Sequence, residues 1–159
     1  FCFFWIQNAE NAPISIAIYS LFTVFLSFIA LSLLEFIFTA QRITRDVLIA
    51  ATASYLIFGN IFTVFFMALE WGTYITTGGQ AFVISATPEI QITWQQMVYY
   101  SYTTLTTLGY GDILPVTLVA QSFATIEAVI GVLYITILLG RLVGLYAQGE
   151  IDEVLERQK

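Results

Sequence analysis

Long apolar stretches with very few charges between them form the main pattern along the chain. Three such stretches, residues 14–34, 47–69 and 113–140, are rich in Leu, Ile, Phe, Val and Ala, and only Glu127 places a charge inside one of them. Each has more than twenty residues, and at about 1.5 Å per residue a helix of that length crosses a hydrocarbon core of roughly 30 Å. The pattern therefore predicts three membrane-spanning helices.

A fourth uncharged stretch, residues 90–111, has a different pattern and does not predict a spanning helix. It contains glutamines, threonines and a serine that could not face lipid without partners. Thr93, followed three residues later by Gln96, is typical of a capping box at a helix N-terminus. The glycines near the end of the stretch predict irregular backbone, which is tolerated at membrane depth only when it is buried in protein or lines an aqueous path. We expect a half-length helix over residues 93–106 that leads into an irregular segment over 107–111.

The positions of the basic residues indicate how the spans are oriented. Two of the five lie between the first two spans and three follow the third span; they are Arg42, Arg45, Arg141, Arg157 and Lys159. All five share one face only if the 90–111 stretch enters the membrane and returns to the same side, so we expect a re-entrant loop. Because basic residues favour the cytoplasmic side, the loop between the first two spans and the C-terminal tail are expected in the cytoplasm.

The composition supports a membrane protein and excludes several other classes. Hydrophobic residues make up 58% of the 159 residues and charged residues only 10%, whereas soluble chains carry roughly 25% charged residues. The net charge of −6 excludes a basic nucleic-acid-binding domain. The chain has no His and a single cysteine, Cys2, and the spans contain no paired carboxylates, so we expect no enzyme activity and no cysteine metal cluster. The two spans before the 90–111 stretch contain no basic residue, which excludes a voltage sensor within them.

One segment of the chain closely resembles the selectivity filter of potassium channels: Thr106-Thr107-Leu108-Gly109-Tyr110-Gly111-Asp112. With the half-length helix before it and the span after it, the segment is similar to the pore module of that family over roughly residues 47–146. The resemblance implies an all-α membrane protein with three spans, or four with a truncated first, plus a re-entrant pore helix and filter. It further implies a homotetramer, in which three identical subunits join each chain around a central pore, with K⁺ ions in the filter and no organic cofactor.

The resemblance also implies roles for individual residues of the filter. The K⁺ ligands would be the backbone carbonyl oxygens of Thr107, Leu108, Gly109 and Tyr110, together with the Thr107 hydroxyl. Tyr110 would point away from the pore axis and support the filter. Glycine adopts positive φ with little steric penalty, so Gly109 and Gly111 suit a backbone that must turn all its carbonyls toward one axis.

Asp112 follows the filter and would lie at the external pore mouth. Its charge would raise the local concentration of cations, and its carboxylate would bond to Tyr99 or Tyr100 behind the filter. Some bacterial relatives place a Glu on the pore helix to pair with this Asp. Thr103 occupies the corresponding position here, so a carboxylate pair is not available.

The third span contains further candidate residues. Gly131 lies twenty residues after Gly111, the spacing of an inner-helix hinge glycine in these channels, and a glycine that allows close helix packing is the alternative. Glu127 is an acid within a span and is expected to play a structural role, bonded to a pore-helix hydroxyl such as Ser101 or Thr104. Four residues at helical spacing either line the cavity below the filter or belong to ordinary helix packing: Val132, Ile135, Thr136 and Leu139.

These predictions divide the chain into four parts. Residues 1–13 form an external segment, whose apolar start is expected to finish an earlier span, with a short interfacial anchor as the alternative. The peripheral helix and a cytoplasmic loop occupy residues 14–46, the pore domain 47–146 and a cytoplasmic tail 147–159. The expected parts of the pore domain are an outer helix 47–69, an external loop 70–92, a pore helix 93–106, a filter 107–111 and an inner helix 115–146.

The expected function is passive conduction of K⁺ across a plasma membrane, of a bacterial cell by resemblance, with the filter mouth on the external side. A weakly selective cation channel on the same fold is the first alternative, and a potassium transporter subunit is the second. The tail has no nucleotide- or calcium-binding motif, so any ligand gate would belong to a regulatory domain or subunit beyond residue 159.

Overall fold

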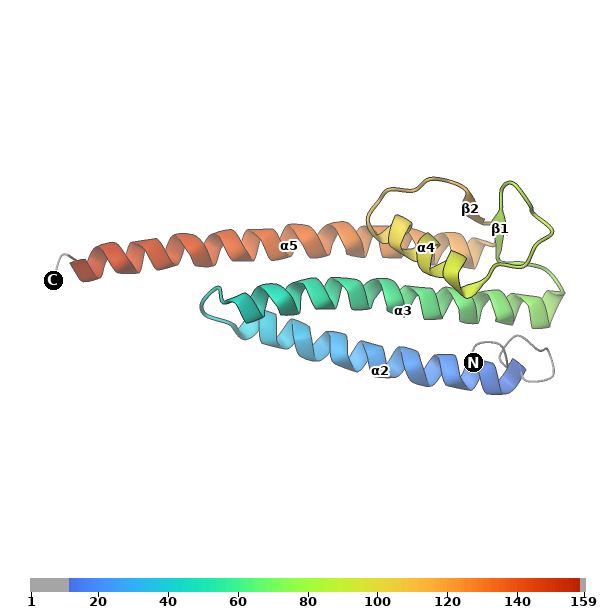
Figure 1. Ribbon diagram of the computed structural model, residues 1–159, viewed down its shortest axis with the longest axis horizontal. Helices are drawn as coiled ribbons and strands as arrows, with labels where there is room; N and C mark the ends of the chain where they lie inside the picture. Colours follow the sequence, from blue (N-terminus) through green and yellow to red (C-terminus); the bar gives the residue numbers. More distant parts are fainter. Residues whose placement is uncertain (1–11, 158–159) are drawn as a thin grey trace.

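Three long helices and one short helix make up most of the fold. The structure, a computed structural model, describes the backbone of residues 12–157 and the side chains of residues 17–147. The elements in chain order are α2 (Ala12–Thr39), α3 (Arg45–Thr77), β1 (Phe82–Ile84), α4 (Trp94–Leu105), β2 (Ile113–Pro115) and α5 (Leu118–Arg157). The long helices α2, α3 and α5 run side by side, and α4 lies with the two strands at one end of them (Figure 1).

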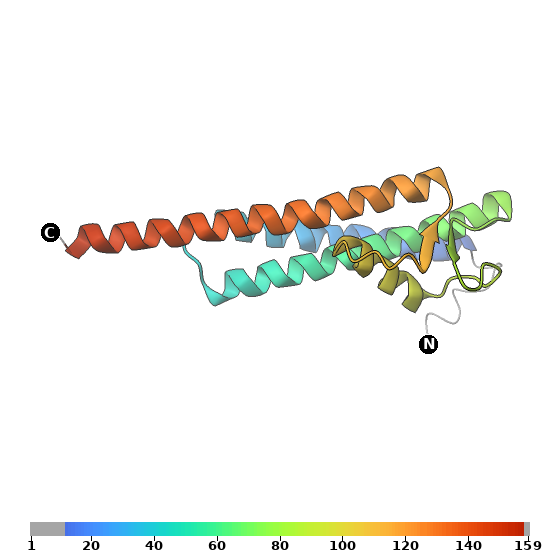
Figure 2. The same cartoon turned by 90° about the horizontal axis from the view of Figure 1, so that it is seen from above.

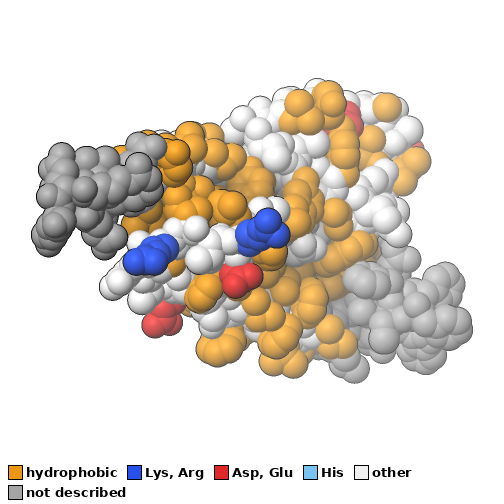
Figure 3. Space-filling view, turned by 60° about the vertical axis from the view of Figure 1, so that its left-hand side comes forward, with side chains coloured by type: hydrophobic (Ala, Val, Ile, Leu, Met, Phe, Trp, Pro, Cys, Tyr) orange, Lys and Arg blue, Asp and Glu red, His pale blue; other side chains and the backbone are white. Residues whose placement is uncertain are grey.

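The three predicted membrane spans are confirmed. Among the described residues, three helical segments are long and apolar enough to cross a membrane: Ala17–Thr39, Arg45–Thr77 and Leu118–Ala147. Many of their large apolar side chains are exposed, as lipid or neighbouring subunits require. Figure 3 shows one face on which apolar side chains predominate and charged side chains are few. The chain is therefore an all-α membrane protein.

The second span is longer than the predicted outer helix 47–69. It begins at Arg45 because Thr44, in extended conformation, caps it and accepts a hydrogen bond from the backbone N–H of Val47. It continues past Glu70 to Thr77, so the charge that ends the apolar stretch does not end the helix. The predicted external loop 70–92 therefore begins only after Thr77, and it contains β1.

The third span begins and ends later than the predicted inner helix 115–146. Residues 113–115 form β2, and α5 begins only at Leu118, where the Thr117 hydroxyl accepts a hydrogen bond from the Ala120 N–H. The helix then continues without a break to Arg157, so the backbone does not change at the predicted boundary between inner helix and tail. The segment after residue 146 contains no proline and many good helix formers, which is why the helix outlasts the apolar stretch.

The first span also exceeds its apolar stretch. α2 extends beyond residues 14–34 and passes Glu35, whose side chain is exposed. Pro13 fits in its first turn, where a helix needs no N–H donor. The predicted role of the apolar start of the chain, as the end of an earlier span or as an anchor, lies outside the described residues.

The segment between α3 and α5 leaves and rejoins the spans at the same end, as predicted for a re-entrant loop. β1 follows α3, β2 precedes α5, and the two strands pair antiparallel with Val83 opposite Leu114. The two ends of the segment are thus hydrogen-bonded neighbours. The loop between them consists of α4 and residues 107–111, which we call the glycine run (Figure 1, Figure 2). The strand pair was not predicted, although a short apolar run after Gly78 and Gly79 is typical of a strand that follows a turn.

Arg141 of α5 joins α2 at the opposite end of the molecule. Its guanidinium group donates to three backbone carbonyls at the end of α2, which belong to Ile37, Phe38 and Ala40. Such carbonyls have no partner within the helix, and a cation there is also favoured by the helix dipole. The contact places Arg141 beside the loop that carries Arg42 and leads to Arg45, the first residue of α3, so these three basic residues gather at one end of the spans, as predicted.

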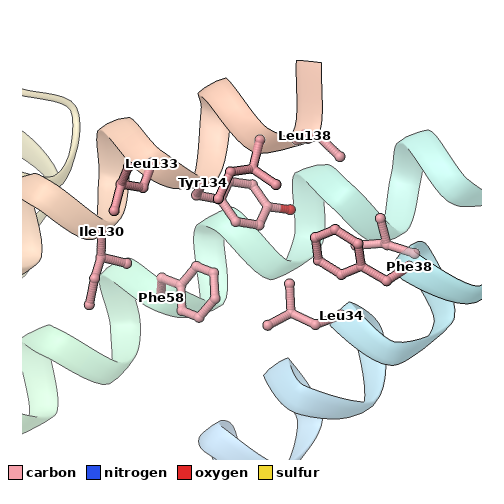
Figure 4. Close-up of a pocket in the computed structure, with 9 residues that line it drawn as sticks. Leu34, Phe38, Phe58, Ile130, Leu133, Tyr134 and Leu138 are labelled. Atoms are coloured by element: carbon pink, nitrogen blue, oxygen red, sulfur yellow. The ribbon is translucent and has the colours of Figure 1, made fainter. Parts of the chain in front are cut away.

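An apolar pocket of about 220 Å³ lies between the last turns of α2 and the facing parts of α3 and α5 (Figure 4). Side chains from all three helices line it, including Leu34 of α2, Phe58 of α3 and Leu133 of α5. The Tyr134 ring also lines it, and the Tyr134 hydroxyl is hydrogen-bonded to Ser54 at 2.6 Å. The three helices therefore leave a gap between their side chains here.

Candidate functional site

The short helix α4 positions the glycine run that follows it. The predicted capping box is present: the Thr93 hydroxyl accepts a hydrogen bond from the Gln96 N–H, and the Gln96 side chain accepts one from the Thr93 N–H. With Thr93 and Thr106 as its caps, the helix agrees with the predicted pore helix 93–106. One side of α4 is buried, and the buried residues are Met97, Tyr100, Ser101, Thr103 and Leu105. The helix is thus fixed at its start and along one face.

The last turn of α4 binds the backbone of the glycine run. The Thr103 carbonyl oxygen accepts hydrogen bonds from the N–H groups of Leu108 at 2.8 Å and Gly109 at 3.0 Å. The Thr104 carbonyl accepts a third from the Thr107 N–H at 2.9 Å. Carbonyls in the last turn of a helix lack partners within the helix. Here the N–H groups of the glycine run are their hydrogen-bond partners. The start of the run is thereby fixed relative to α4.

Residues 107–111 alternate in the sign of φ. Thr107, Gly109 and Gly111 have φ of 59°, 53° and 75°, whereas Leu108 and Tyr110 are not among the residues with positive φ. Positive φ at the two glycines confirms their predicted conformation. Positive φ at Thr107 was not predicted, because the left-handed region is unusual for a β-branched residue. Alternation of left- and right-handed residues aligns the backbone N–H groups on one side, so the carbonyl oxygens can form a row on the other.

A row of neutral oxygens can ligate a cation that has lost its water. Among the described residues, no group of His, Cys, Asp and Glu side chains could bind a metal ion. Within residues 107–111, the oxygen atoms that could ligate a cation are the backbone carbonyls and the hydroxyl groups of Thr107 and Tyr110.

The glycine run is exposed within a single chain. Every residue from 106 to 112 is exposed, including Tyr110 at 66%. Tyr110 stacks on Tyr99 of α4, with ring centroids 6.2 Å apart and an angle of 4° between the ring planes. The Tyr99 hydroxyl also interacts with the Asp112 carboxylate, since desolvation and, to a lesser extent, Asp112 raise the pKa of Tyr99. Tyr99, and not the buried Tyr100, is therefore the tyrosine that meets Asp112 behind the run.

Ser85, the residue after β1, holds the end of the glycine run. Its N–H donates to the Asp112 carbonyl at 2.8 Å, and its hydroxyl donates to the Gly111 carbonyl at 3.1 Å. The Asp112 carboxylate also accepts a hydrogen bond from the Ile113 N–H at 3.1 Å. Sequence reasoning missed Ser85, because only the pairing of β1 with β2 brings it close to Asp112.

A buried acid lies behind α4 and connects three helices. Glu127 of α5 has no exposed surface. The Ser101 Oγ lies 2.5 Å from its Oε1 and 2.8 Å from the Gly59 carbonyl oxygen of α3. Glu127 thus meets Ser101, one of its two predicted partners. The acid belongs to the packing behind the glycine run.

Gly131 allows α5 to approach the end of α4 closely. A Cβ at this position would overlap the carbonyl oxygen of Leu105, the last residue of α4. The Tyr55 hydroxyl of α3 donates to the same carbonyl at 3.2 Å. This contact supports the packing role for Gly131, and the hinge role stays a prediction.

The four residues predicted to line a cavity lie on an exposed side of α5. Val132, Ile135 and Leu139 have exposed fractions of 50%, 50% and 59%, and Thr136 is also exposed. They are therefore not part of the core of a single chain. Their role as a cavity lining stays a prediction.

A second buried acid, Glu70, was placed in the external loop by sequence reasoning. Its side chain is only 7% exposed, and its Oε2 accepts hydrogen bonds from the N–H groups of Ala81 at 2.7 Å and Phe82 at 3.0 Å. The carboxylate thus ties the end of α3 to the start of β1, which in turn leads to Ser85. No short-range signal marks this role, since the partners lie more than ten residues away.

Comparison with known families identifies the class of protein. Residues 43–148, about two thirds of the chain, match the family described as ion channel. The chain belongs to the ion channel family. Comparisons with curated proteins and with solved structures give no match.

The matched region of this ion channel begins just before α3 and ends within α5. It therefore includes α4, the glycine run and the two spans around them, and it leaves out α2. An ion channel conducts ions passively across a membrane, which agrees with the three spans, and ion channels are not a class of enzymes.

Proposed function

We propose that this ion channel is a homotetramer that conducts K⁺ selectively through a filter formed by residues 107–111. Four copies surround one axis, and the carbonyl oxygens of Thr107, Leu108, Gly109 and Tyr110, with the Thr107 hydroxyl, replace the water around K⁺. One chain contributes a single row of oxygens, which is too few to surround a cation. The proposal therefore requires several chains, and a fourfold arrangement fits the resemblance.

The observation that carries this proposal is the alternating φ of the exposed segment from Thr107 to Gly111. A left-handed conformation is unfavourable by about 1–2 kcal/mol for a residue with a Cβ, yet Thr107 has a φ of 59°. Strain of this kind persists only where the surroundings hold it, and it clusters at functional sites. The Thr103 carbonyl provides that support through its hydrogen bonds to Leu108 and Gly109.

The charges at the two ends support an orientation for the proposed channel. Asp112 lies directly after the filter, where a carboxylate raises the local cation concentration. Arg42, Arg45 and Arg141 gather at the opposite end, and basic residues favour the cytoplasmic side. We therefore place the filter mouth outside a plasma membrane, of a bacterial cell by resemblance, and the arginines in the cytoplasm.

The direct test is ion flux through the purified chain in liposomes, with K⁺ and Na⁺ gradients measured separately. We expect K⁺ flux that clearly exceeds Na⁺ flux. Equal flux of the two ions would instead support a weakly selective cation channel. The absence of flux for both ions would contradict the proposal.

Two glycines provide a matched pair of variants. Gly109 and Gly78 have φ of 53° and 70°, and a Cβ at either position meets no atom within 4 Å. Alanine therefore adds a similar backbone penalty of about 1–2 kcal/mol at each site, but only Gly109 lies in the proposed filter. We expect Gly109→Ala to lose K⁺ flux or selectivity and Gly78→Ala to keep both. Unchanged flux and selectivity in Gly109→Ala would contradict the assignment of the filter.

The subunit number has a test of its own. Native mass spectrometry of the purified chain should give a mass of four copies. The expectation follows from the exposed apolar side chains of Leu108 and Tyr110, which adjacent subunits would cover. A conducting assembly with a different number of chains would contradict the homotetramer.

A further inference from the structure

The contact between Glu127 and Ser101 depends on which of the two side chains carries the shared proton. The Ser101 hydroxyl has one proton and two oxygen neighbours, Glu127 Oε1 at 2.5 Å and the Gly59 carbonyl oxygen at 2.8 Å. The carbonyl can only accept a hydrogen bond. If Ser101 donates to Gly59, the proton in the shorter contact must belong to Glu127, which is then a neutral carboxylic acid.

The alternative is a charged carboxylate that accepts the Ser101 proton. In that case the second oxygen, Oε2, would carry charge in the protein interior, where it is buried and has no hydrogen-bond partner among the described residues. A fully buried carboxylate with one hydrogen bond is strongly unfavourable, particularly inside a membrane span. The contacts therefore favour the neutral acid.

The groups that surround Glu127 offer no positive charge in compensation. The titratable side chains within electrostatic reach are Tyr55 of α3 and Tyr100 of α4, and both hydroxyls are neutral at pH 7. The polar groups in contact with it, Ser101 and through it the Gly59 carbonyl, are also uncharged. In the part of the chain that the structure describes, neither α3 nor α4 thus places a cation beside the acid.

We propose that Glu127 is a protonated positioning residue that donates a hydrogen bond to Ser101, while Ser101 donates one to the Gly59 carbonyl. This relay of two hydrogen bonds fixes the position of α4 behind the filter. Ser101 is two residues before Thr103, whose carbonyl binds the N–H groups of Leu108 and Gly109. A displacement of Ser101 therefore moves the carbonyl that fixes the filter backbone. Ionisation of Glu127 at alkaline pH breaks the relay, because the carboxylate cannot donate to Ser101, and K⁺ flux falls.

The protonation state has a test that does not depend on conduction. Infrared spectroscopy distinguishes the carbonyl stretch of a neutral carboxylic acid from the bands of a carboxylate. At neutral pH, the difference spectrum between the wild type and Glu127→Gln should contain the neutral-acid band. Glu35 lies in α2 with an exposed side chain, so the difference spectrum for Glu35→Gln is the control and should lack it. A Glu127→Gln spectrum that shows loss of a carboxylate band instead would overturn the proposal.

The effect on the filter is tested by the pH profile of K⁺ flux in liposomes, which rests on the proposed function. The Gln amide can still donate to Ser101, so Glu127→Gln should keep flux within about twofold at neutral pH and retain it at alkaline pH. The wild type should lose flux by about tenfold as Glu127 ionises, the effect of losing one buried hydrogen bond. Identical alkaline profiles for the two proteins would overturn the positioning role. If the wild type does not conduct at all, the proposed function fails, while the infrared result still decides the protonation state.

Ser101→Ala provides an independent variant within the same relay. It removes the hydroxyl that accepts from Glu127 and donates to Gly59, and its small change in volume should leave the fold intact. We expect it to reduce K⁺ flux by about tenfold at neutral pH. Once Ser101→Ala has broken the relay, adding Glu127→Gln should no longer preserve flux at alkaline pH. A Ser101→Ala protein with wild-type flux and a wild-type pH profile would overturn the relay.

Discussion

At the end of the molecule that carries the glycine run, α3, α4, α5 and the strand pair share a core of ten buried apolar residues, whereas α2 and α3 share a core of only four near Arg141. We call these regions the filter end and the Arg141 end. The filter end also contains both buried acids, Glu70 and Glu127. At the Arg141 end, the Arg141 guanidinium group of α5 donates to α2 and Leu138 of α5 packs against the smaller core, and the apolar pocket borders this core.

The difference indicates which part of the channel is rigid and which part can move. Regions with few buried contacts open at lower free energy than a densely packed core. The proposed filter depends on a backbone conformation that needs firm support, and the larger core at the filter end can provide it. We therefore expect changes in α5 during gating to begin at the Arg141 end, and the following substitutions test this comparison.

The largest effect is expected for Gly131→Ala at the filter end. The added methyl group would overlap the Leu105 carbonyl oxygen, which is backbone and cannot rotate away. Overpacking typically destabilises by about 1–3 kcal/mol and occasionally more; because the overlap is with backbone, we expect the upper end of this range and a separation of α5 from the end of α4. Equilibrium unfolding in mixed micelles measures the loss, and K⁺ flux should disappear with it.

Gly140 in the same helix is the matched control for Gly131. A Cβ at Gly140 meets no atom within 4 Å, so Gly140→Ala should be neutral or stabilise the helix by up to about 1 kcal/mol. Similar destabilisation by both variants would show that α5 tolerates no alanine at all. The close contact between Gly131 and Leu105 would then not explain the result.

A smaller but still large effect is expected for Glu70→Ala, which removes the acceptor for the buried N–H groups of Ala81 and Phe82. Leaving buried donors without partners is unfavourable by about 1–3 kcal/mol. Hydrogen exchange at these two amides should become faster. Glu70→Gln keeps an acceptor oxygen and should restore most of the protection. If the two variants exchange equally fast, the charge rather than the hydrogen bonds holds β1.

The main features of the fold could be predicted because they follow from local patterns. Apolar stretches predicted the three spans, and Thr93 with Gln96 predicted the capping box and hence the start of α4. Helix ends were less accurate, because a charge such as Glu70 was taken as the end of a helix. The structure shows that hydrogen bonds from Ala81 and Phe82 allow Glu70 to lie buried within α3. Such distant partners cannot be found from the residues next to Glu70.

The site was predicted where a single residue type imposes the geometry and missed where distant segments combine. Positive φ at Gly109 and Gly111 followed from glycine itself, while positive φ at Thr107 contradicts the preference of its side chain and depends on the surrounding contacts. Ser85 has a role only because β1 pairs with β2. Ser101 was predicted as a partner of Glu127 because both lie on helices whose approach the pore-module resemblance implied.

At the Arg141 end, Arg141→Lys should destabilise the contact with α2 by about 1–2 kcal/mol. The planar guanidinium group donates to three carbonyls at once, and an ammonium group cannot reproduce that geometry. Hydrogen exchange in the last turn of α2 should become faster, while exchange at Leu108 and Gly109 should not change. Faster exchange at the filter would contradict the separation of the two ends.

The smallest effect is expected for Tyr134→Phe, beside the apolar pocket. The Tyr134 hydroxyl bonds to Ser54 at 2.6 Å and to the Ala51 carbonyl at 2.7 Å, and it joins α5 to α3. Its removal leaves Ser54 with acceptors on its own helix, so the loss should be about 0.5–1.5 kcal/mol in equilibrium unfolding.

A matched control and a double variant show how much this hydroxyl contributes to the Arg141 end. Tyr146 of α5 is 64% exposed, so Tyr146→Phe should change stability very little. If Ser54 and Tyr134 are coupled, Ser54→Ala with Tyr134→Phe should destabilise by less than the sum of the single variants. An additive result would mean that the pair does not hold α5 to α3. The half of α5 beyond the pocket would then depend on Arg141 alone among the polar contacts described for it, which would make the contrast between the two ends still larger.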